Sequence, residues 1–91
     1  MQKRVHAVAE GLVQGVGYRW FIAKTAERFG LKGYVRNLFD GTVEMEIQGD
    51  AEHFGKFFAE AQKGPFGASV SNIKRVEKPA TDEFTGFEIR R

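Results

Sequence analysis

The sequence contains no cysteine, and this absence excludes disulfide bonds, thiolate chemistry and metal sites built on thiolates. It suits a reducing compartment, so we expect a cytoplasmic protein. No apolar run approaches the length of a membrane span, and the start of the chain lacks the apolar stretch of a signal peptide, so we expect no membrane partner. The net charge of +2 is far below that of a typical nucleic-acid-binding domain but is compatible with a small anionic ligand.

Clusters of metal-ligating side chains are also missing. The two histidines, His6 and His53, lie far apart in the sequence without ligand spacing, and no Asp-rich segment suggests a magnesium site. We therefore expect no metal and no cofactor. What is present is a chain of 91 residues, 42% hydrophobic with nine Phe. This is enough for one small domain, residues 1–91, with a core that needs no disulfide.

Hydrophobic periodicity predicts five strands and two helices. The expected strands are 4–10, 33–39, 42–48, 70–78 and 84–90, and the expected helices are 18–29 and 50–63. The order β-α-β-β-α-β with a short final strand is typical of a ferredoxin-like α+β sandwich, in which one antiparallel sheet carries both helices on one face. Asp40-Gly41 predicts the hairpin turn between the second and third strands, and Asp50 predicts the cap of the second helix.

Strand alternation also predicts which side chains are buried. In the third strand apolar residues alternate with Glu44 and Glu46, so we expect these two glutamates to be solvated on the outer face of the sheet. In the last strand we expect Phe87 and Ile89 to face inward. An irregular step in the pattern after Val70 predicts a β-bulge.

A dense group of glycines lies between the first strand and the first helix, in the segment from Gly11 to Arg19. Glycine reaches positive φ at no steric cost, so such a loop can fold tightly and aim its backbone N–H groups inward. The start of a helix adds unpaired N–H groups and a partial positive charge, and Arg19 adds a fork of donors that matches phosphate oxygens. These features predict an anion cradle for a phosphate.

This loop differs from the two best-known phosphate-binding loops. No Gly-Lys-Ser/Thr ends it, so it is not a Walker A loop. Trp20 stands where the third glycine of a dinucleotide fingerprint belongs. A plain strand-to-helix turn that merely needs glycines is the alternative, and Arg19 at the helix start favours anion binding.

Asn37, at the end of the expected second strand, can meet this loop near one end of the sheet. As a residue next to a hairpin it can be an ordinary turn residue, but beside a phosphate cradle its amide can hold a water. A site of one arginine, N–H groups and an amide stabilises charge but has no acid to protonate a leaving group. It therefore favours a leaving group that departs as an anion, such as a carboxylate, whose conjugate acid has a pKa of ~4. These residues indicate acyl phosphates rather than phosphate monoesters.

Two segments carry a resemblance to a known family. Gly11 to Arg19 together with Gly33 to Asn37 resembles the two signatures of acylphosphatases. The second signature continues, at the family's spacing, through Gly41, Val43 and Gly49. The resemblance extends over essentially the whole chain, including the Gly64-Pro65 break and the Phe87-Glu88-Ile89 ending. It implies a small ferredoxin-like enzyme that hydrolyses the carboxyl–phosphate bond of acyl phosphates without a metal or cofactor.

The resemblance also implies roles for individual residues. The family's phosphate-binding arginine falls on Arg19, and its water-orienting asparagine falls on Asn37. Its phosphate-binding loop falls on Gln14, Gly15, Val16, Gly17 and Tyr18. Two positions depart from the commonest pattern. Leu12 replaces the usual arginine, which removes a charge at the start of the loop, and Tyr18 stands where the family often has phenylalanine.

Two other functions remain open at this point. RNA-recognition domains share this fold plan, and residues 32–39 faintly resemble their basic-aromatic strand motif, but this segment lies on the second expected strand rather than the third. A phosphate-binding module without turnover is the other alternative. The residues and the resemblance together favour a monomeric enzyme whose partner is a small-molecule acyl phosphate, with no nucleic-acid partner.

Overall fold

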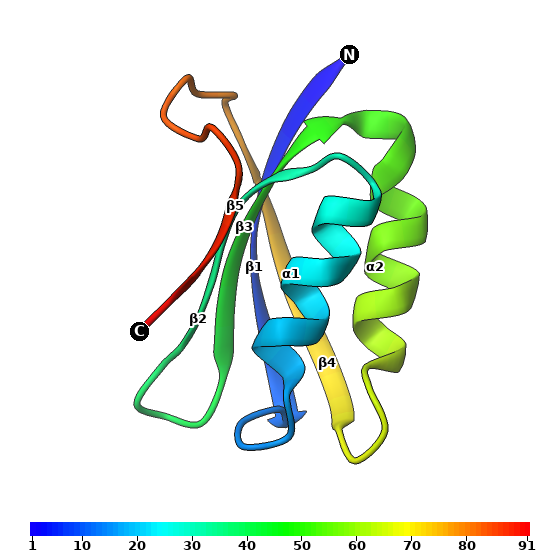
Figure 1. Cartoon of the computed structure of the whole chain (residues 1–91), viewed down its shortest axis with the longest axis vertical. Helices are drawn as coiled ribbons and strands as arrows, with labels where there is room; N and C mark the ends of the chain where they lie inside the picture. The colour runs from blue at the N-terminus through cyan, green and yellow to red at the C-terminus, as the bar shows by residue number, and fades with distance from the viewer.

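The computed structural model describes all residues 1–91 and consists of one sheet with two helices on one face (Figure 1). In chain order the elements are β1 (Gln2–Leu12), α1 (Tyr18–Arg28), β2 (Lys32–Asn37), β3 (Val43–Asp50), the 3₁₀ turn η1 (Ala51–His53), α2 (Phe54–Lys63), β4 (Ser69–Lys78) and β5 (Phe87–Arg90). The predicted α+β plan is confirmed. Most strand ends differ from the sequence prediction by one or two residues. Two differences are larger: the first turn after Asp50 is 3₁₀ rather than α-helical, and β5 begins at Phe87 rather than at residue 84.

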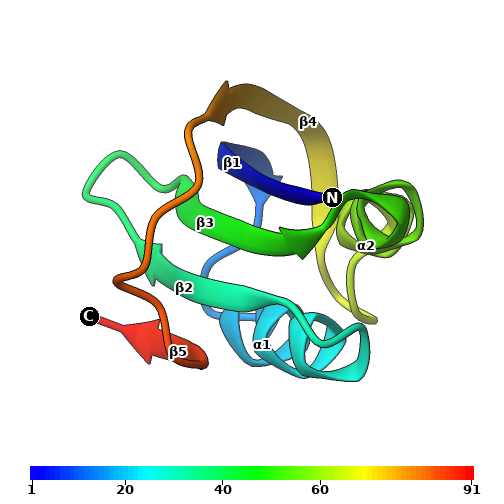
Figure 2. The same cartoon turned by 90° about the horizontal axis from the view of Figure 1, so that it is seen from above.

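The five strands have the order β4-β1-β3-β2-β5. The first four pair antiparallel, as expected, whereas β5 runs parallel to β2 with Ile89 opposite Val35. The sheet is therefore mixed. β4 ends at the same end of the sheet where β2 begins. The segment after β4 crosses at that end from the β4 edge to the β2 edge, so β5 runs back along β2 in the same direction (Figures 1 and 2).

The core lies between the sheet and the two helices, which Figure 2 shows on the same side. It is built from the apolar positions of the predicted patterns: inward residues of β1, β2 and β3 and the inner stripes of both helices. Its largest fully buried side chains are Tyr18, Phe57, Ile22, Met45, Ile47, Val13, Val35 and Val43. Burial of one large apolar side chain contributes about 1.5–3 kcal/mol, so this cluster is the main source of stability. Neither helix has the length or apolar composition needed to cross a bilayer.

The outer face of the sheet is covered around Glu44 and Glu46, and the prediction that these two glutamates are solvated is wrong. Glu46 is only 5% exposed and accepts a hydrogen bond from Arg4 at 2.6 Å. Glu44 bonds to both His6 and Arg36. Burial raises the pKa of the Glu44 carboxyl, but these hydrogen bonds outweigh it and the net pKa is lowered.

Glu46 is buried because the segment 79–86 crosses the outer face before β5 begins (Figure 1). Phe84 of this segment is buried against Tyr34, with ring centroids 6.2 Å apart. The Arg4 guanidinium lies over the same Phe84 ring. Strand alternation alone cannot reveal such a cover, because it depends on a segment far along the chain.

Two smaller expectations concern the strand ends. The β-bulge is confirmed: the β1–β4 register shifts between Glu10 and Gly11, which leaves Ser71 without a partner. A Cβ at Gly11 would lie 2.1 Å from the Ser69 carbonyl oxygen, so only glycine fits where β1 passes into the next loop. In β5, Phe87 packs against the core, but Ile89 is 47% exposed, so its expected burial is wrong.

Candidate active site

The glycine-rich loop connects β1 to α1 and carries a run of backbone donors without backbone partners. None of the N–H groups from Gln14 to Trp20 donates a hydrogen bond to a backbone carbonyl. Gly15 and Gly17 adopt φ of 75° and 77°, a conformation that favours glycine. Unpaired backbone donors are costly when they are buried. Successive N–H groups without a backbone acceptor can hydrogen-bond to the oxygen atoms of an anion that reaches the loop.

The start of α1 adds to this donor set. The helix begins after Gly17, with no side-chain cap and no acidic residue in its first turn. The first intrahelical bond of this end runs from Phe21 N–H to the Gly17 carbonyl at 3.0 Å. The partial positive charge of the helix N-terminus is thus left unneutralised by the chain itself.

The loop, the helix start and the end of β2 meet around one hollow of about 200 Å³. Its lining consists of Val13, Gly15, Gly17, Tyr18, Arg19, Trp20, Asn37 and Ile89. The structure therefore brings Arg19 and Asn37, which are 18 positions apart in the sequence, to the same small space. Figure 1 shows the loop and the turn after β2 at the same end of the molecule.

Asn37, the last residue of β2, holds an unsatisfied acceptor. Its side-chain oxygen Oδ1 is buried and has no hydrogen-bond partner, and it is the one buried side-chain polar atom in the structure for which this is true. Buried polar atoms in proteins are nearly always paired with protein or with ordered water. The Asn37 oxygen at the wall of the hollow is therefore placed to accept a hydrogen bond from a bound molecule.

Arg19 is held by a residue near the other end of the chain. Its Nη1 donates to the carbonyl oxygen of Arg90 in β5 at 3.1 Å. The planar guanidinium has five N–H donors, so one bond to the backbone fixes its orientation and leaves the others for an anion. The sequence held no signal for this contact, because it joins residues 71 positions apart through the parallel strand β5.

The side chain of Gln14 connects the glycine-rich loop to the β2–β3 turn. Its Nε2 donates to the carbonyl oxygens of Leu38 at 2.7 Å and Thr42 at 2.9 Å, both in the β2–β3 turn. The side chain thus ties the loop to the turn that follows Asn37, and only its backbone N–H remains for a ligand. The turn is further ordered by Asp40, whose carboxylate accepts from the hydroxyl and N–H of Thr42, and these bonds lower the Asp40 pKa.

The side chains of Tyr18 and Val16 also lie mainly in or against the core rather than in the hollow. Tyr18 is 1% exposed, and its hydroxyl donates to the Ala61 carbonyl at 2.8 Å inside the core. Burial raises the pKa of the Tyr18 phenol well above its usual range. Val16 packs against the core cluster. Both residues can therefore contribute to ligand binding mainly through their backbone N–H groups.

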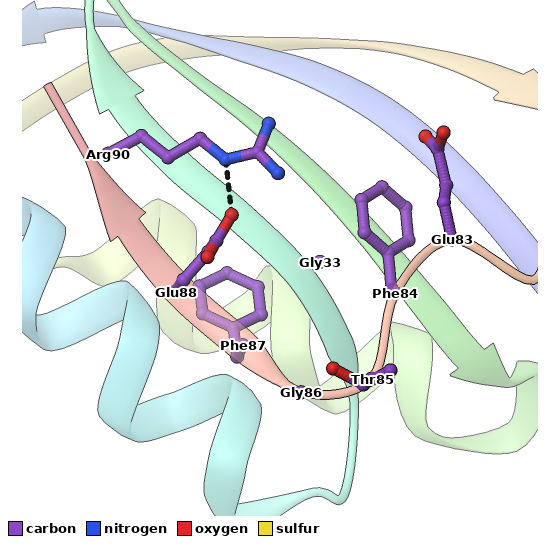
Figure 3. Close-up of a pocket in the computed structure, with 8 residues that line it drawn as sticks. All are labelled: Gly33, Glu83, Phe84, Thr85, Gly86, Phe87, Glu88 and Arg90. Carbon is purple, nitrogen blue, oxygen red and sulfur yellow. Dashed lines mark hydrogen bonds and ion pairs between the residues drawn. The ribbon is translucent and has the colours of Figure 1, made fainter.

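Of the three other hollows in the structure, one adjoins this hollow and two lie apart from it. A wider hollow of about 640 Å³ shares the Asn37 wall and is lined by Gln14, Arg36, Asn37, Leu38, Phe39 and Arg91. Figure 3 shows another on the far side of β5, where Glu88 and Arg90 pair with each other beside Phe84. The hollow in Figure 3 contains none of the predicted site residues, and the two charged residues that pair in it, Glu88 and Arg90, both belong to its own lining. No three His, Asp or Glu side chains gather into a metal-binding group anywhere in the chain.

The fold and the hollow together define a small α+β domain with an uncapped helix N-terminus and an arginine beside one hollow. The family profile described as Acylphosphatase matches residues 5–89, so the chain belongs to the acylphosphatase family. The acylphosphatase of Chlorobaculum tepidum is 47% identical over 97% of this chain and 96% of its own length. That of Methylococcus capsulatus is 45% identical over 98% and 97%.

Comparison of the fold with solved structures also indicates the acylphosphatase family. The crystal structure of acylphosphatase from Bacillus subtilis superposes over 100% of both chains with a TM-score of 0.94 at 28% identity. With this family membership, the chain is an enzyme that hydrolyses acyl phosphates. The resemblance stated from the two sequence signatures is confirmed.

Proposed function

We propose that Arg19 and the backbone N–H groups of residues 14–19 hold the phosphoryl group of the substrate while Asn37 orients the attacking water. The reaction is a single in-line displacement: the water oxygen forms a bond to phosphorus as the bond from phosphorus to the acyl oxygen breaks. The products are a carboxylate and inorganic phosphate. Residues 1–91 act in this proposal as one cytoplasmic, monomeric domain with a small-molecule acyl phosphate as its partner.

The phosphoryl-holding part rests on the donors described above. The loop and the first turn of α1 offer N–H groups that make no backbone hydrogen bond, and the Arg19 guanidinium lines the same hollow. Such donors are aimed before the reaction begins, so they stabilise charge as it develops without the cost of reorganising solvent. Positioning and electrostatic stabilisation are the main contributions that proteins make to phosphoryl transfer.

The water-orienting part rests on one observation, the unpaired and buried Oδ1 of Asn37. A carboxamide oxygen can accept a hydrogen bond from water and direct its lone pair, but a neutral amide cannot take a proton at neutral pH. The water's proton therefore goes to a phosphate oxygen of the substrate itself. No other group that lines the hollow is a base in its ordinary charge state.

The leaving group explains why the site needs no acid. A carboxylate leaves as a stable anion because its conjugate acid has a pKa of ~4. An alcohol would need protonation as it leaves, and the lining of the hollow offers no carboxylic acid or imidazole for that step. This supports acyl phosphates over phosphate monoesters and a reaction that proceeds without a metal ion.

The test is the hydrolysis of benzoyl phosphate by Asn37→Ala, with inorganic phosphate as a competitive probe of binding. We expect turnover to fall by ~10²–10³, as for the loss of one oriented hydrogen bond in an active site, while phosphate still inhibits. Asn72→Ala is the matched control, since Asn72 is exposed and bonds only to Glu10 at 3.2 Å. A near-normal rate in Asn37→Ala would remove the water-orienting role.

The wild-type enzyme is assayed in the same series with and without EDTA. An unchanged rate supports a metal-independent reaction, and a lost rate contradicts it. If the wild type bound phosphate but did not turn over benzoyl phosphate, a binding module would replace the enzyme in this proposal. Retention of single-stranded RNA at low salt without hydrolysis would support the RNA-binding alternative instead.

A further inference from the structure

The hollow that contains Arg19 and Asn37 has an apolar side that phosphate binding does not use. Four of its lining side chains are apolar. Val13 and Tyr18 are buried parts of the core, but Trp20 is 61% exposed and Ile89 is 47% exposed. An exposed tryptophan at the rim of a polar hollow presents a large apolar surface to whatever enters.

These two side chains come from different elements that the fold places side by side. Trp20 belongs to the first turn of α1, and Ile89 to β5, which lies next to β2 and α1 in Figure 2. The Trp20 ring is steadied by Lys24 one turn later, whose Nζ lies 5.7 Å from the ring centroid. The Arg90 carbonyl that holds Arg19 also belongs to β5, so the same strand serves both sides of the hollow.

The direction of the reaction decides which side the acyl group occupies. In an in-line displacement the attacking water and the leaving oxygen lie on opposite sides of phosphorus. Asn37 marks the water side, and beyond it lies the wider hollow with Arg36 and Phe39. The acyl group must therefore lie away from Asn37, toward the exposed rim, where Trp20 and Ile89 are the only exposed apolar side chains of the lining.

We propose that Trp20 and Ile89 form the binding surface for the acyl group and that the enzyme selects acyl phosphates with an apolar, preferably aromatic, acyl group. This inference rests on the proposed roles of Arg19 and Asn37 and adds the substrate class that the same site prefers. The Trp20 side chain contacts the acyl group and not the phosphoryl group. Its contribution should then appear as discrimination between acyl groups and not as a general loss of phosphate binding.

The test compares benzoyl phosphate with acetyl phosphate, which share the reacting bond and differ in the size of the acyl group. We expect Trp20→Ala to lower the benzoyl-to-acetyl ratio of kcat/KM by about tenfold relative to the wild type, at the lower end of what apolar pocket contacts supply. Dividing by the wild-type ratio removes the difference in intrinsic reactivity of the two substrates. Trp20→Phe should recover most of the ratio because it restores an aromatic face.

The matched control is Phe66→Ala, which removes a fully exposed aromatic side chain; unlike Trp20, Phe66 lines none of the hollows. It should leave the ratio within about twofold of the wild type, well below the discrimination expected of a pocket contact. The inhibition constant for inorganic phosphate is measured in parallel, and Trp20→Ala should change it by less than about threefold, since phosphate lacks an acyl group.

Each other outcome contradicts the inference in a distinguishable way. An unchanged ratio in Trp20→Ala, with both substrates hydrolysed, overturns the acyl-binding surface and leaves the roles of Arg19 and Asn37 intact. An equal loss on both substrates with weaker phosphate inhibition would show that Trp20 supports the phosphate loop instead. If the wild type hydrolysed neither substrate, the proposed function and this inference would fail together.

Discussion

The two helices of this protein begin in different ways. At the start of η1, which leads into α2, the Asp50 carboxylate accepts a hydrogen bond from Glu52 N–H at 3.3 Å, and Glu52 adds a second negative charge. At the start of α1, Gly17 offers no side-chain cap and no acidic residue follows. The second residue of α1 is instead the cation Arg19.

The comparison shows why only one of the two helix ends is suited to bind an anion. Both ends have a partial positive charge and unpaired N–H groups. At η1 and α2 the chain neutralises that charge itself, and the end is structural. At α1 the partial positive charge is not neutralised, and the cation Arg19 adds to it. The two helix starts lie at opposite ends of the sheet (Figure 1). The proposed phosphate site therefore depends on the missing cap as much as on Arg19.

The largest expected effect is the loss of the cation at the open end. Arg19→Gln should lower kcat on benzoyl phosphate by ~10³ or more, because an arginine that balances transition-state charge in phosphoryl transfer contributes 10³–10⁵. Phosphate inhibition should be lost as well. Arg28→Gln, near the other end of α1 and ion-paired with Glu60, is the control and should retain both properties. Strong inhibition by phosphate in Arg19→Gln would contradict this assignment.

The second prediction makes the start of α1 resemble that of η1. Gly17→Asp places a carboxylate beside the free N–H groups, where it competes with and repels a phosphoryl group. The inhibition constant for phosphate should rise by ~10-fold or more, as expected for like charges a few ångströms apart near a surface. Gly17→Asn is matched for the strain of φ 77°, and a Cβ there meets nothing within 4 Å. Equal effects of Asp and Asn would assign the loss to backbone strain rather than to charge.

How much of this could be predicted from the sequence depends on how local each signal is. The glycine-rich loop and the positions of Arg19 and Asn37 beside it were predictable, because glycine spacing, a helix start and a hairpin turn are each encoded within a few residues. The Asp50 cap and the bulge after Val70 were predictable for the same reason. Each of these features is determined by the conformation of a short segment.

The remaining features depend on contacts between distant segments. The burial of Glu46 depends on residues 79–86 crossing the outer face, and the direction of β5 depends on where that crossing ends. The hydrogen bonds of the Gln14 side chain to the β2–β3 turn could not be predicted, because its acceptors lie 24 and 28 positions later in the chain. Such partners become visible only when the whole chain is folded.

The third prediction concerns this link between the open loop and Asn37. Gln14→Leu removes two hydrogen bonds, each of which contributes about 0.5–1.5 kcal/mol, while the Leu38 and Thr42 carbonyls keep their backbone donors. We expect kcat to fall by roughly tenfold and stability by about 1–3 kcal/mol, the sum of the two bonds. Activity is measured with benzoyl phosphate and stability by urea unfolding. Gln62→Leu, which removes an exposed bond to the Val70 carbonyl, is the control for a stability loss without a kinetic one. If kcat in Gln14→Leu were normal, Asn37 would not need this positioning.

The smallest kinetic effect is expected at the capped end. Asp50→Ala should lower the free energy of unfolding by about 1 kcal/mol, the usual contribution of a helix cap, and leave kcat and KM for benzoyl phosphate unchanged. Urea unfolding and steady-state kinetics on the same sample measure the two quantities. A change in phosphate inhibition in Asp50→Ala would show that the two helix ends are coupled, and the contrast between them would fail.

The most direct test is to titrate inorganic phosphate into the ¹⁵N-labelled protein and follow its backbone amide signals. We expect the signals of the backbone amides of residues 14–20 and of the Arg19 side chain to shift together with one dissociation constant. The amide signals of Glu52 and His53 should not shift. Shifts of similar size at η1, or no saturable shifts in the loop after β1, would contradict the claim that the uncapped start of α1 is the phosphate-binding site.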